Sequence, residues 1–398
     1  MEWMSGPAPA LAARTQSRAR TAAVVLAGFC AFLSLFAPQP LLPLLSKAFQ
    51  ASPAAVSWVV TASTLAVAIS APLTGAIADR FGRKSVIVAA AFLLVVPTAL
   101  AGASGSLPQL LFWRFWQGIL TPGIFAVTIA YITEEWATGA GAAMSAYVGG
   151  TVAGGFAGRM VAGLAASRLS WRYAFYSLGA LNLLGGIAIW WWLPASRTAV
   201  RAKREGTGAA MLRHLGNPRL VATFCVGFCV LFCLIATFNY VNFYLAAPPF
   251  RLGPAALGLL FTVYLVGAFV TPVAGRWIDR IGHRFTLATA FTFGILGVSL
   301  TLVQSLPVVI IGLALCSTGS FIGHASASSF IGTVVADSRA AAVGLYVMCY
   351  YAGGSAGSAL SGVMWNRDGW PGCVALVASV QALTIGISMV AWRPAKKS

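Results

Sequence analysis

The sequence predicts an all-α integral membrane protein whose twelve transmembrane helices form two six-helix bundles. Three observations lead to this prediction. The 398 residues are 59% hydrophobic and only 9% charged, with a mean hydropathy of +0.84, whereas soluble domains are typically ~25% charged. Apolar runs long enough to cross a ~30 Å hydrocarbon core recur along the whole chain. A charged turn near residue 80 is repeated near residue 280.

The predicted helices are the apolar runs between short polar segments. In chain order they cover 21–45, 54–78, 86–103, 107–131, 141–166, 172–194, 219–246, 254–278, 285–304, 307–332, 339–363 and 369–392. Three arginines precede the first run, as in a signal peptide. That run continues through the proline-bearing stretch FAPQPLLPLL without a clear small-residue cleavage site, so we interpret it as a retained helix.

The longest polar interval divides the predicted helices into six and six. We expect a cytoplasmic tail at 1–20, an N-terminal bundle at 21–194, a linker at 195–218, a C-terminal bundle at 219–392 and a second tail at 393–398.

The lysines and arginines predict the orientation. A net charge of +18 would suit nucleic-acid binding on a basic domain, but these cations lie in short loops between apolar runs, so no nucleic-acid partner is expected. Positive loops stay in the cytoplasm. The predicted inner cations are Arg14, Arg18, Arg20, Arg80, Arg83, Lys84, Arg197, Arg201, Lys203, Arg204, Arg213, Arg219, Arg276, Arg280, Arg284, Arg339, Arg393, Lys396 and Lys397. The outer ones are Lys47, Arg168, Arg172, Arg251 and Arg367. Both termini are therefore expected in the cytoplasm.

An internal repeat relates the two halves. Aligning each residue with the one 200 positions later places Asp79 on Asp279 and Gly82 on Gly282. Each copy of the turn follows the second helix of its half, so the halves share one orientation and form a parallel repeat. We expect the bundles to be related by a pseudo-two-fold axis along the membrane normal, with a substrate path between them.

The repeated turns carry a family signature. The first, GAIADRFGRK (75–84), matches G-x-x-x-D-R-x-G-R-[KR] in full, and GRWIDRIGHR (275–284) matches it loosely. RFWQG (114–118) matches a second signature, R-x-x-x-G. On these motifs the chain resembles the major facilitator superfamily over nearly its whole length. NYVNFY (239–244) and YITEEW (131–136) look most similar to bacterial drug:proton antiporters and sugar-efflux permeases, although Gly158-Arg159 stands where the antiporter signature has Gly-Pro.

The resemblance implies that the charged turns form a latch, which holds the cytoplasmic ends of the bundles together in the outward-open state. The alternative is a purely topological role, but this would not explain Asp79, because acids contribute little to orientation. The implied latch residues are Gly75, Asp79, Arg80, Gly82, Arg83, Asp279, Arg280 and Gly282.

Two arginines lie inside predicted helices, where an ionisable group indicates function. Arg114 and Arg159 lie at similar depths, roughly 10 Å below the outer surface at 1.5 Å per residue, and Gln117 is one turn from Arg114. We expect them to line a shared cavity that attracts an anionic or polyhydroxyl solute. Pairing with backbone carbonyls and snorkelling outward are the alternatives. All eight acids fall in tails, loops or helix ends, which disfavours a drug:proton exchange on a buried carboxylate.

Proton coupling has three candidate residues. His324 lies among serines in the tenth predicted helix, and histidine titrates near neutrality. The alternative is a neutral histidine that is hydrogen-bonded to a serine or a backbone carbonyl. Asp79 and Glu135, at inner helix ends, are the other candidates, and Glu135 is the better placed of the two, at the end of the fourth helix.

A few polar side chains on an apolar wall are the expected substrate contacts. Asn239, Tyr240 and Asn242 form the densest such cluster, in the seventh helix. Gln39, in the proline-bearing stretch of the first helix, is a further candidate.

Small residues at every fourth position predict close helix packing. Gly150, Gly154 and Gly158 form such a face in the fifth helix, and Gly353 and Gly357 form one in the eleventh. Because these helices contact the opposite bundle in the family that the chain resembles, we expect both faces at the bundle interface.

The seven cysteines all fall inside apolar runs and predict no disulfide framework. Cys225, Cys229 and Cys233 share one helix face, a spacing that could bind a soft metal, but we interpret it as apolar packing. No metal or cofactor is expected.

These features together predict a secondary active transporter of the bacterial inner membrane, a monomer that exports a small drug-like or sugar-like solute in exchange for protons. The alternative is an importer or exchanger of an anionic metabolite that uses Arg114 and Arg159. A non-transporting sensor or scaffold is the alternative from another class, but such a chain should lose the first charged turn or its cavity polar residues, and both are present. No converging nucleophile, base or metal cluster predicts an enzyme.

Overall fold

The computed structural model describes residues 8–136, 138–195, 207–335 and 337–393. Every regular element in these ranges is a helix, as predicted. Parts of both predicted tails and residues 196–206 of the predicted linker lie outside the described residues. The same holds for the side chains of the predicted inner cations Arg14, Arg197, Arg201, Lys203, Arg204, Lys396 and Lys397.

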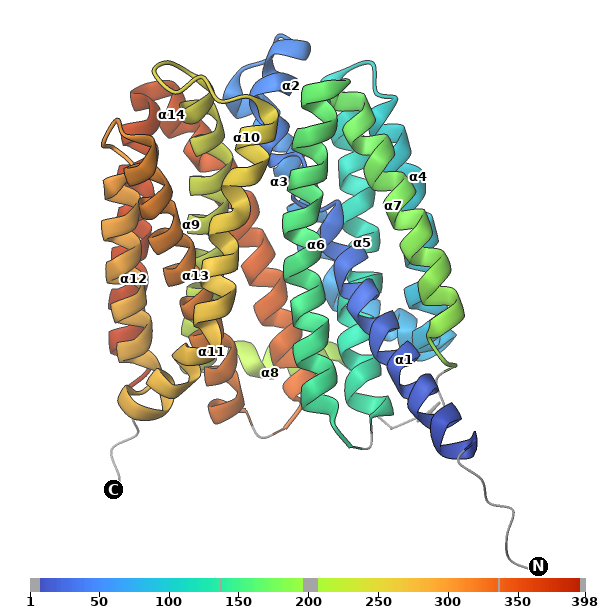
Figure 1. The fold of residues 1–398 in the computed structure, drawn as a ribbon. Coiled ribbons are helices and arrows are strands. Elements are labelled where there is room, and N and C mark those ends of the chain that lie inside the picture. The colour runs from blue at the N-terminus through green and yellow to red at the C-terminus, as the bar shows by residue number, and fades with distance from the viewer. Residues whose placement is uncertain (1–7, 137, 196–206, 336, 394–398) are drawn as a thin grey trace, which may run out of the picture.

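The N-terminal half begins with a broken helix (Figure 1). α1 (Ala8–Leu33) ends at an irregular stretch, and η1 (Gln39–Leu41) and α2 (Leu42–Ala48) complete the first predicted span. Prolines at 38, 40 and 43 explain the break, because proline cannot donate a helical hydrogen bond. The other helices of this half are α3 (Pro53–Phe81), α4 (Arg83–Gly102), α5 (Leu107–Glu135), α6 (Ala140–Arg168) and α7 (Trp171–Trp192).

The C-terminal half repeats this arrangement. A short helix, α8 (Thr207–Leu215), lies in the predicted linker and contacts the C-terminal half, where Arg213 Nη2 donates to Ser338 Oγ at 3.3 Å. It is followed by α9 (Pro218–Ala246), α10 (Pro254–Leu259), η2 (Leu260–Thr262), α11 (Val263–Ile281), α12 (His283–Leu300), α13 (Leu306–Val334) and α14 (Arg339–Ala391).

The last two predicted helices are joined in α14. This element has 53 residues, and Gly369 interrupts it with a φ of 63°. Within the described residues, eight helices are long and apolar enough to cross a membrane, α14 being counted once. Counting the two parts of α14 separately gives nine spans, and α1, α6 and α12 complete the twelve that were predicted. The two-bundle fold is therefore confirmed.

Cap residues determine where several helices begin. Ser52 Oγ accepts a hydrogen bond from the backbone N–H of Ala55 at 3.2 Å, and Ser106 Oγ accepts one from Gln109 at 3.4 Å. A proline follows each serine in the first helical turn, where its missing N–H has no cost. These polar N-caps explain why the predicted starts near 54 and 107 agree with the structure.

Both charged turns lie at one end of the molecule, which we call the basic end. It is the end that carries α8 in Figure 1, whereas α2 lies at the opposite end. Gly82 joins α3 to α4 with φ 86° and ψ 143°, and Gly282 joins α11 to α12 with φ 81° and ψ 161°. A side chain strongly disfavours this conformation. The repeat seen in the sequence is therefore also a repeat of backbone geometry.

The glycine faces of α6 and α14 pack inside their own bundles. A Cβ atom on Gly154 or Gly158 would collide with backbone carbonyls of α1, and Gly150 faces the same helix. Gly353 and Gly357 of α14 approach the backbone of α9 in the same way. The prediction that these glycine faces lie at the bundle interface is therefore wrong. The spacing of the glycines indicates that two backbones approach closely, but it does not specify which helix is the partner.

Candidate functional site

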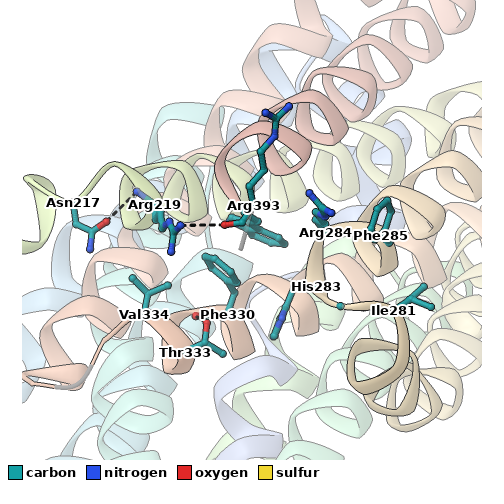
Figure 2. A pocket seen from close by; sticks show the side chains of 12 residues that line it. Asn217, Arg219, Ile281, His283, Arg284, Phe285, Phe330, Thr333, Val334 and Arg393 are labelled. Carbon is teal, nitrogen blue, oxygen red and sulfur yellow. Dashed lines mark hydrogen bonds between the residues drawn. The ribbon is translucent and has the colours of Figure 1, made fainter. Parts of the chain in front are cut away.

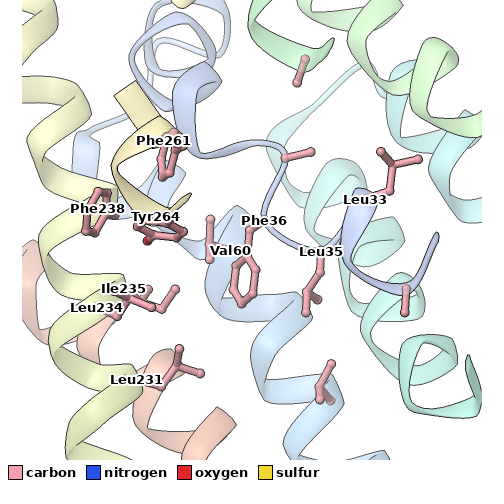
Figure 3. Close-up of a cluster of buried hydrophobic side chains, with 14 of the residues drawn as sticks. Leu33, Leu35, Phe36, Val60, Leu231, Leu234, Ile235, Phe238, Phe261 and Tyr264 are labelled. Atoms are coloured by element: carbon pink, nitrogen blue, oxygen red, sulfur yellow. The ribbon is translucent and has the colours of Figure 1, made fainter. Parts of the chain in front are cut away.

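An apolar wall lies where the two bundles meet (Figure 3). Leu234 and Phe238 of α9 and Tyr264 of α11 belong to one buried cluster with Phe36, in the break after α1, and Val60 of α3. Phe36, Leu234 and Tyr264 each retain 7–8% exposure. A wall of this kind suits the apolar body of a small organic molecule.

A chain of buried hydrogen bonds crosses between the bundles beside this wall. Arg159 Nε donates to Gln39 Oε1 at 2.7 Å, and Gln39 Nε2 donates to Asn239 Oδ1 at 2.8 Å. Asn239 Nδ2 then donates to Ser358 Oγ at 2.9 Å, and Ser358 Oγ donates to the carbonyl of Ser57 at 3.0 Å. All five residues are buried, and the chain passes from the N-terminal bundle into the C-terminal bundle and back.

Other contacts join the bundles nearby. The hydroxyls of Thr64 in α3 and Ser355 in α14 lie 2.8 Å apart. Gly163 of α6 faces the backbone of Pro254 and Gly258 in α10. Because α3 starts at the opposite end and α10 also lies there, these contacts extend from the middle of the helices toward the opposite end.

Arg159 has one amino group available for a ligand. Nη1 donates to the carbonyl of Gly155 at 2.7 Å, while Nη2 makes no hydrogen bond to the described part of the chain. The guanidinium lies 4.5 Å from the ring centre of Phe261 and 5.0 Å from that of Tyr264, in cation–π contact. The buried Tyr264 hydroxyl also has no hydrogen-bond partner in the described chain. Two polar groups beside an apolar wall are thus available to a ligand.

Arg114 has a different environment from Arg159. Its five N–H donors are all used, and its acceptors are the carbonyls of Val59 (3.0 Å), Ser34 (2.9 Å) and Leu35, together with Ser63 Oγ (2.8 Å) and Gln117 Oε1. Ser34 and Leu35 follow the last residue of α1, so their carbonyls lack helical donors. Arg114 therefore completes the broken helix, and it shares no partner with Arg159.

The predicted contacts of the seventh helix divide into two groups. Asn239 lies in the hydrogen-bond chain, and the Tyr240 hydroxyl donates to the carbonyl of Ser358 at 3.1 Å. Asn242 instead donates to the carbonyl of Phe238 in its own helix, while its buried Oδ1 has no hydrogen-bond partner among the described residues.

His324 lies within the C-terminal bundle, between α13 and α14. Its Nδ1 is 3.0 Å from the Tyr346 hydroxyl, and its ring centre is 4.7 Å from that of Tyr350. The hydrogen-bond partner is therefore a tyrosine rather than the serine or backbone carbonyl considered from the sequence.

The first charged turn makes its ion pairs within the N-terminal bundle. Arg83 Nη2 lies 2.7 Å from Asp79 Oδ1 and 2.8 Å from Glu134 Oε1 at the end of α5. Glu135 lies 4.0 Å from Arg20. The other latch candidates outside this network, Gly75, Arg80, Asp279 and Arg280, are exposed at the basic end.

Sequence reasoning missed Ser57, Ser358 and Tyr264. Ser358 lies on a helix face of small residues, and its position does not distinguish it from the other residues of that face. Ser57 contributes only its backbone carbonyl. Tyr264 is one of ten tyrosines in a chain where tyrosine commonly marks the membrane interface. Within the described residues, no group of three or more histidine, cysteine or acidic residues could hold a metal.

The model of the Major Facilitator Superfamily matches residues 24–250 and 231–398. The chain belongs to the major facilitator superfamily. This major facilitator is 32% identical over 371 residues to the MFS-type transporter YybF of Bacillus subtilis (strain 168), covering 92% of each chain. It is 33% identical over 373 residues to the inner membrane transport protein YnfM of Escherichia coli (strain K12), covering 92% of this chain and 89% of that one.

A solved structure shares the fold. The crystal structure of the nucleoside transporter NupG has a TM-score of 0.79 at 16% identity, covering 94% of this chain and all of NupG. The relatives are transporters rather than enzymes. The protein is accordingly a multi-pass membrane protein of the secondary transporter type.

Proposed function

We propose that this major facilitator exports a small organic solute across the bacterial inner membrane by alternating access, in exchange for protons. The observation that carries the proposal is the hydrogen-bond chain that joins the bundles through Gln39 and Asn239. The lysine and arginine distribution supports a cytoplasmic basic end. In that orientation the hydrogen-bond chain closes the outer side of the transporter, and the structure corresponds to an inward-facing state.

The two unpaired polar groups beside the apolar wall support a substrate that carries a strong hydrogen-bond acceptor. Arg159 Nη2 and the Tyr264 hydroxyl are unpaired in the described chain, and both adjoin aromatic rings. A solute with a carboxylate or another strong acceptor on an apolar body satisfies both groups. The charge-assisted hydrogen bond to Arg159 supplies the recognition, and the apolar wall supplies the contact area.

The charged turn and the proton carriers belong to the same cycle. In the outward-open state, Asp79, Arg80 and Arg83 hold the cytoplasmic ends of the bundles together, and this contact is released in the inward-facing state. Protons enter at His324 or Glu135, since the eight acids include none in the middle of a span.

A second candidate function follows from Arg159 itself. Within the part of the chain that the structure describes, the guanidinium pairs with no carboxylate, which favours an anionic metabolite that is taken up or exchanged without protons.

Transport in proteoliposomes distinguishes the two functions. Benzoate, a neutral sugar and a cationic dye serve as probes, each with and without an imposed pH gradient. Export coupled to protons predicts that a gradient drives probe movement, and the same flux without a gradient supports anion exchange instead.

Arg159→Gln tests the substrate class in the same assay. It should weaken benzoate transport about tenfold or more, as expected for the loss of a charge-assisted hydrogen bond, while the exposed control Arg168→Gln should transport normally. Equal benzoate affinity in Arg159→Gln and wild type would remove Arg159 from the substrate site.

A further inference from the structure

A basic cavity of about 600 Å³, drawn in Figure 2, lies at the basic end of the C-terminal bundle and shares no lining residue with the candidate functional site. It is formed by the start of α9, the turn between α11 and α12, and the ends of α13 and α14. Arg219, His283, Arg284 and Arg393 line it, and none of the described residues in its lining carries a carboxylate. Asp279, one turn before His283, is exposed and is not part of the lining.

The repeated half of the molecule shows what is missing from this cavity. α5 and α13 both have 29 residues, and their last two positions are Glu134 and Glu135 in α5 but Thr333 and Val334 in α13. In the N-terminal half, Glu134 neutralises the turn through Arg83. In the C-terminal half, Thr333 and Val334 line the cavity, so neither of these positions supplies a carboxylate to its arginines.

The surroundings indicate where the neutralising anion comes from. The cavity lies at the ends of membrane-spanning helices, where lipid headgroups are expected. Its rim carries Ile281 and Phe285, which are 47% and 43% exposed, and its floor holds the Phe330 and Trp392 rings stacked at 4.6 Å. Apolar side chains beside a cluster of arginines match a phosphodiester attached to acyl chains.

We propose that this cavity binds the phosphodiester headgroup of an anionic phospholipid. Arg219 already has one donor committed to the carbonyl of Arg393 at 3.1 Å, and its remaining donors, with those of Arg284, are available to the phosphate oxygens. The lipid takes the electrostatic role that Glu134 has in the other half. This inference does not depend on the substrate or on proton coupling.

The test is native mass spectrometry of the detergent-purified full chain with phosphatidylglycerol or phosphatidylcholine. The wild type should retain phosphatidylglycerol selectively. Thr333→Glu places a carboxylate where α5 has one and should abolish this retention. Thr333 is exposed, so folding should be preserved. Thr333→Gln, the neutral isostere, should bind like the wild type.

Arg284→Gln tests the cations directly. It should weaken phosphatidylglycerol binding roughly fivefold, whereas Arg168→Gln at the opposite end should not. Wild-type retention by Thr333→Glu, or equal retention of phosphatidylcholine, would overturn the proposal. Inorganic phosphate that displaces the lipid at equal concentration would overturn it too, because the site would then be one for a soluble anion.

Discussion

The bond between Gln39 and Asn239 should control the balance between the two states of the transporter. Gln39→Leu removes the 2.8 Å bond to Asn239 and the 2.7 Å bond from Arg159. A neutral bond contributes about 0.5–1.5 kcal/mol and one to a charged group about 1.5–3 kcal/mol. Arg159 and Gln39 both belong to the N-terminal bundle, so only the bond to Asn239 distinguishes the two states. The closed outer side therefore loses about 0.5–1.5 kcal/mol relative to the outward-open state. Because each ~1.4 kcal/mol is a factor of ten, the ratio of closed to open molecules should fall by roughly two- to tenfold.

Spin-label distances across the opposite end measure this ratio. Labels on cysteines introduced at Arg168 and Arg367, which are exposed in different bundles, should show a longer distance in Gln39→Leu. Cys225 and Cys349, the cysteines that are not buried, are replaced by serine beforehand.

A matched control and a double-mutant cycle make the test specific. Thr61→Val removes a hydroxyl that donates only within α3, at 3.3 Å to the carbonyl of Ser57, so it should leave the distance unchanged. Gln39→Leu combined with Asn239→Leu should shift the ratio by less than the sum of the single effects. Wild-type distances in Gln39→Leu, or strictly additive effects, would refute the gating role of the bond.

Three further substitutions have definite expected outcomes. Arg114→Met leaves the carbonyls of Ser34 and Leu35 without a donor, each worth about 1–3 kcal/mol, so it should lower the melting temperature markedly in detergent; lost transport at an unchanged melting temperature would instead place Arg114 in the substrate path. Asp79→Asn should reduce transport in proteoliposomes while folded yield is maintained, and wild-type rates would contradict the latch. His324→Gln should flatten the pH dependence of transport between about pH 6 and 8, whereas an unaltered profile would exclude this histidine from the proton path.

The sequence predicted the spans well because hydropathy and cap residues report directly on membrane burial and on helix starts. It separated the last two helices at 363 and 369, whereas the helix continues to Gly369. Helical hydrogen bonding extends beyond the apolar run, and hydropathy does not detect it. The prolines predicted the break after Leu33, but they did not predict that the carbonyls of Ser34 and Leu35 lose their helical donors there.

Those carbonyls explain why the two intramembrane arginines were harder to interpret. Arg114 and Arg159 have the same charge and similar depth, so they could not be distinguished from the sequence alone. Their partners do: backbone carbonyls of the broken helix surround Arg114, while side chains of both bundles surround Arg159. A hydrogen-bond partner that is a backbone group has no sequence signature. The sequence likewise does not identify the helix that packs against a face of glycines.

The amide pair at the bundle interface has an evolutionary consequence. Gln39 and Asn239 stand 200 residues apart, the spacing at which the charged turns repeat, and they bond to each other. In a symmetric dimer of half-length ancestors, a residue beside the two-fold axis meets its own copy. Two carboxylates or two ammonium groups repel each other there, whereas a carboxamide both donates and accepts. A primary amide is thus a side chain that could have paired with itself before the gene was duplicated, and then diverged by one methylene without losing the bond.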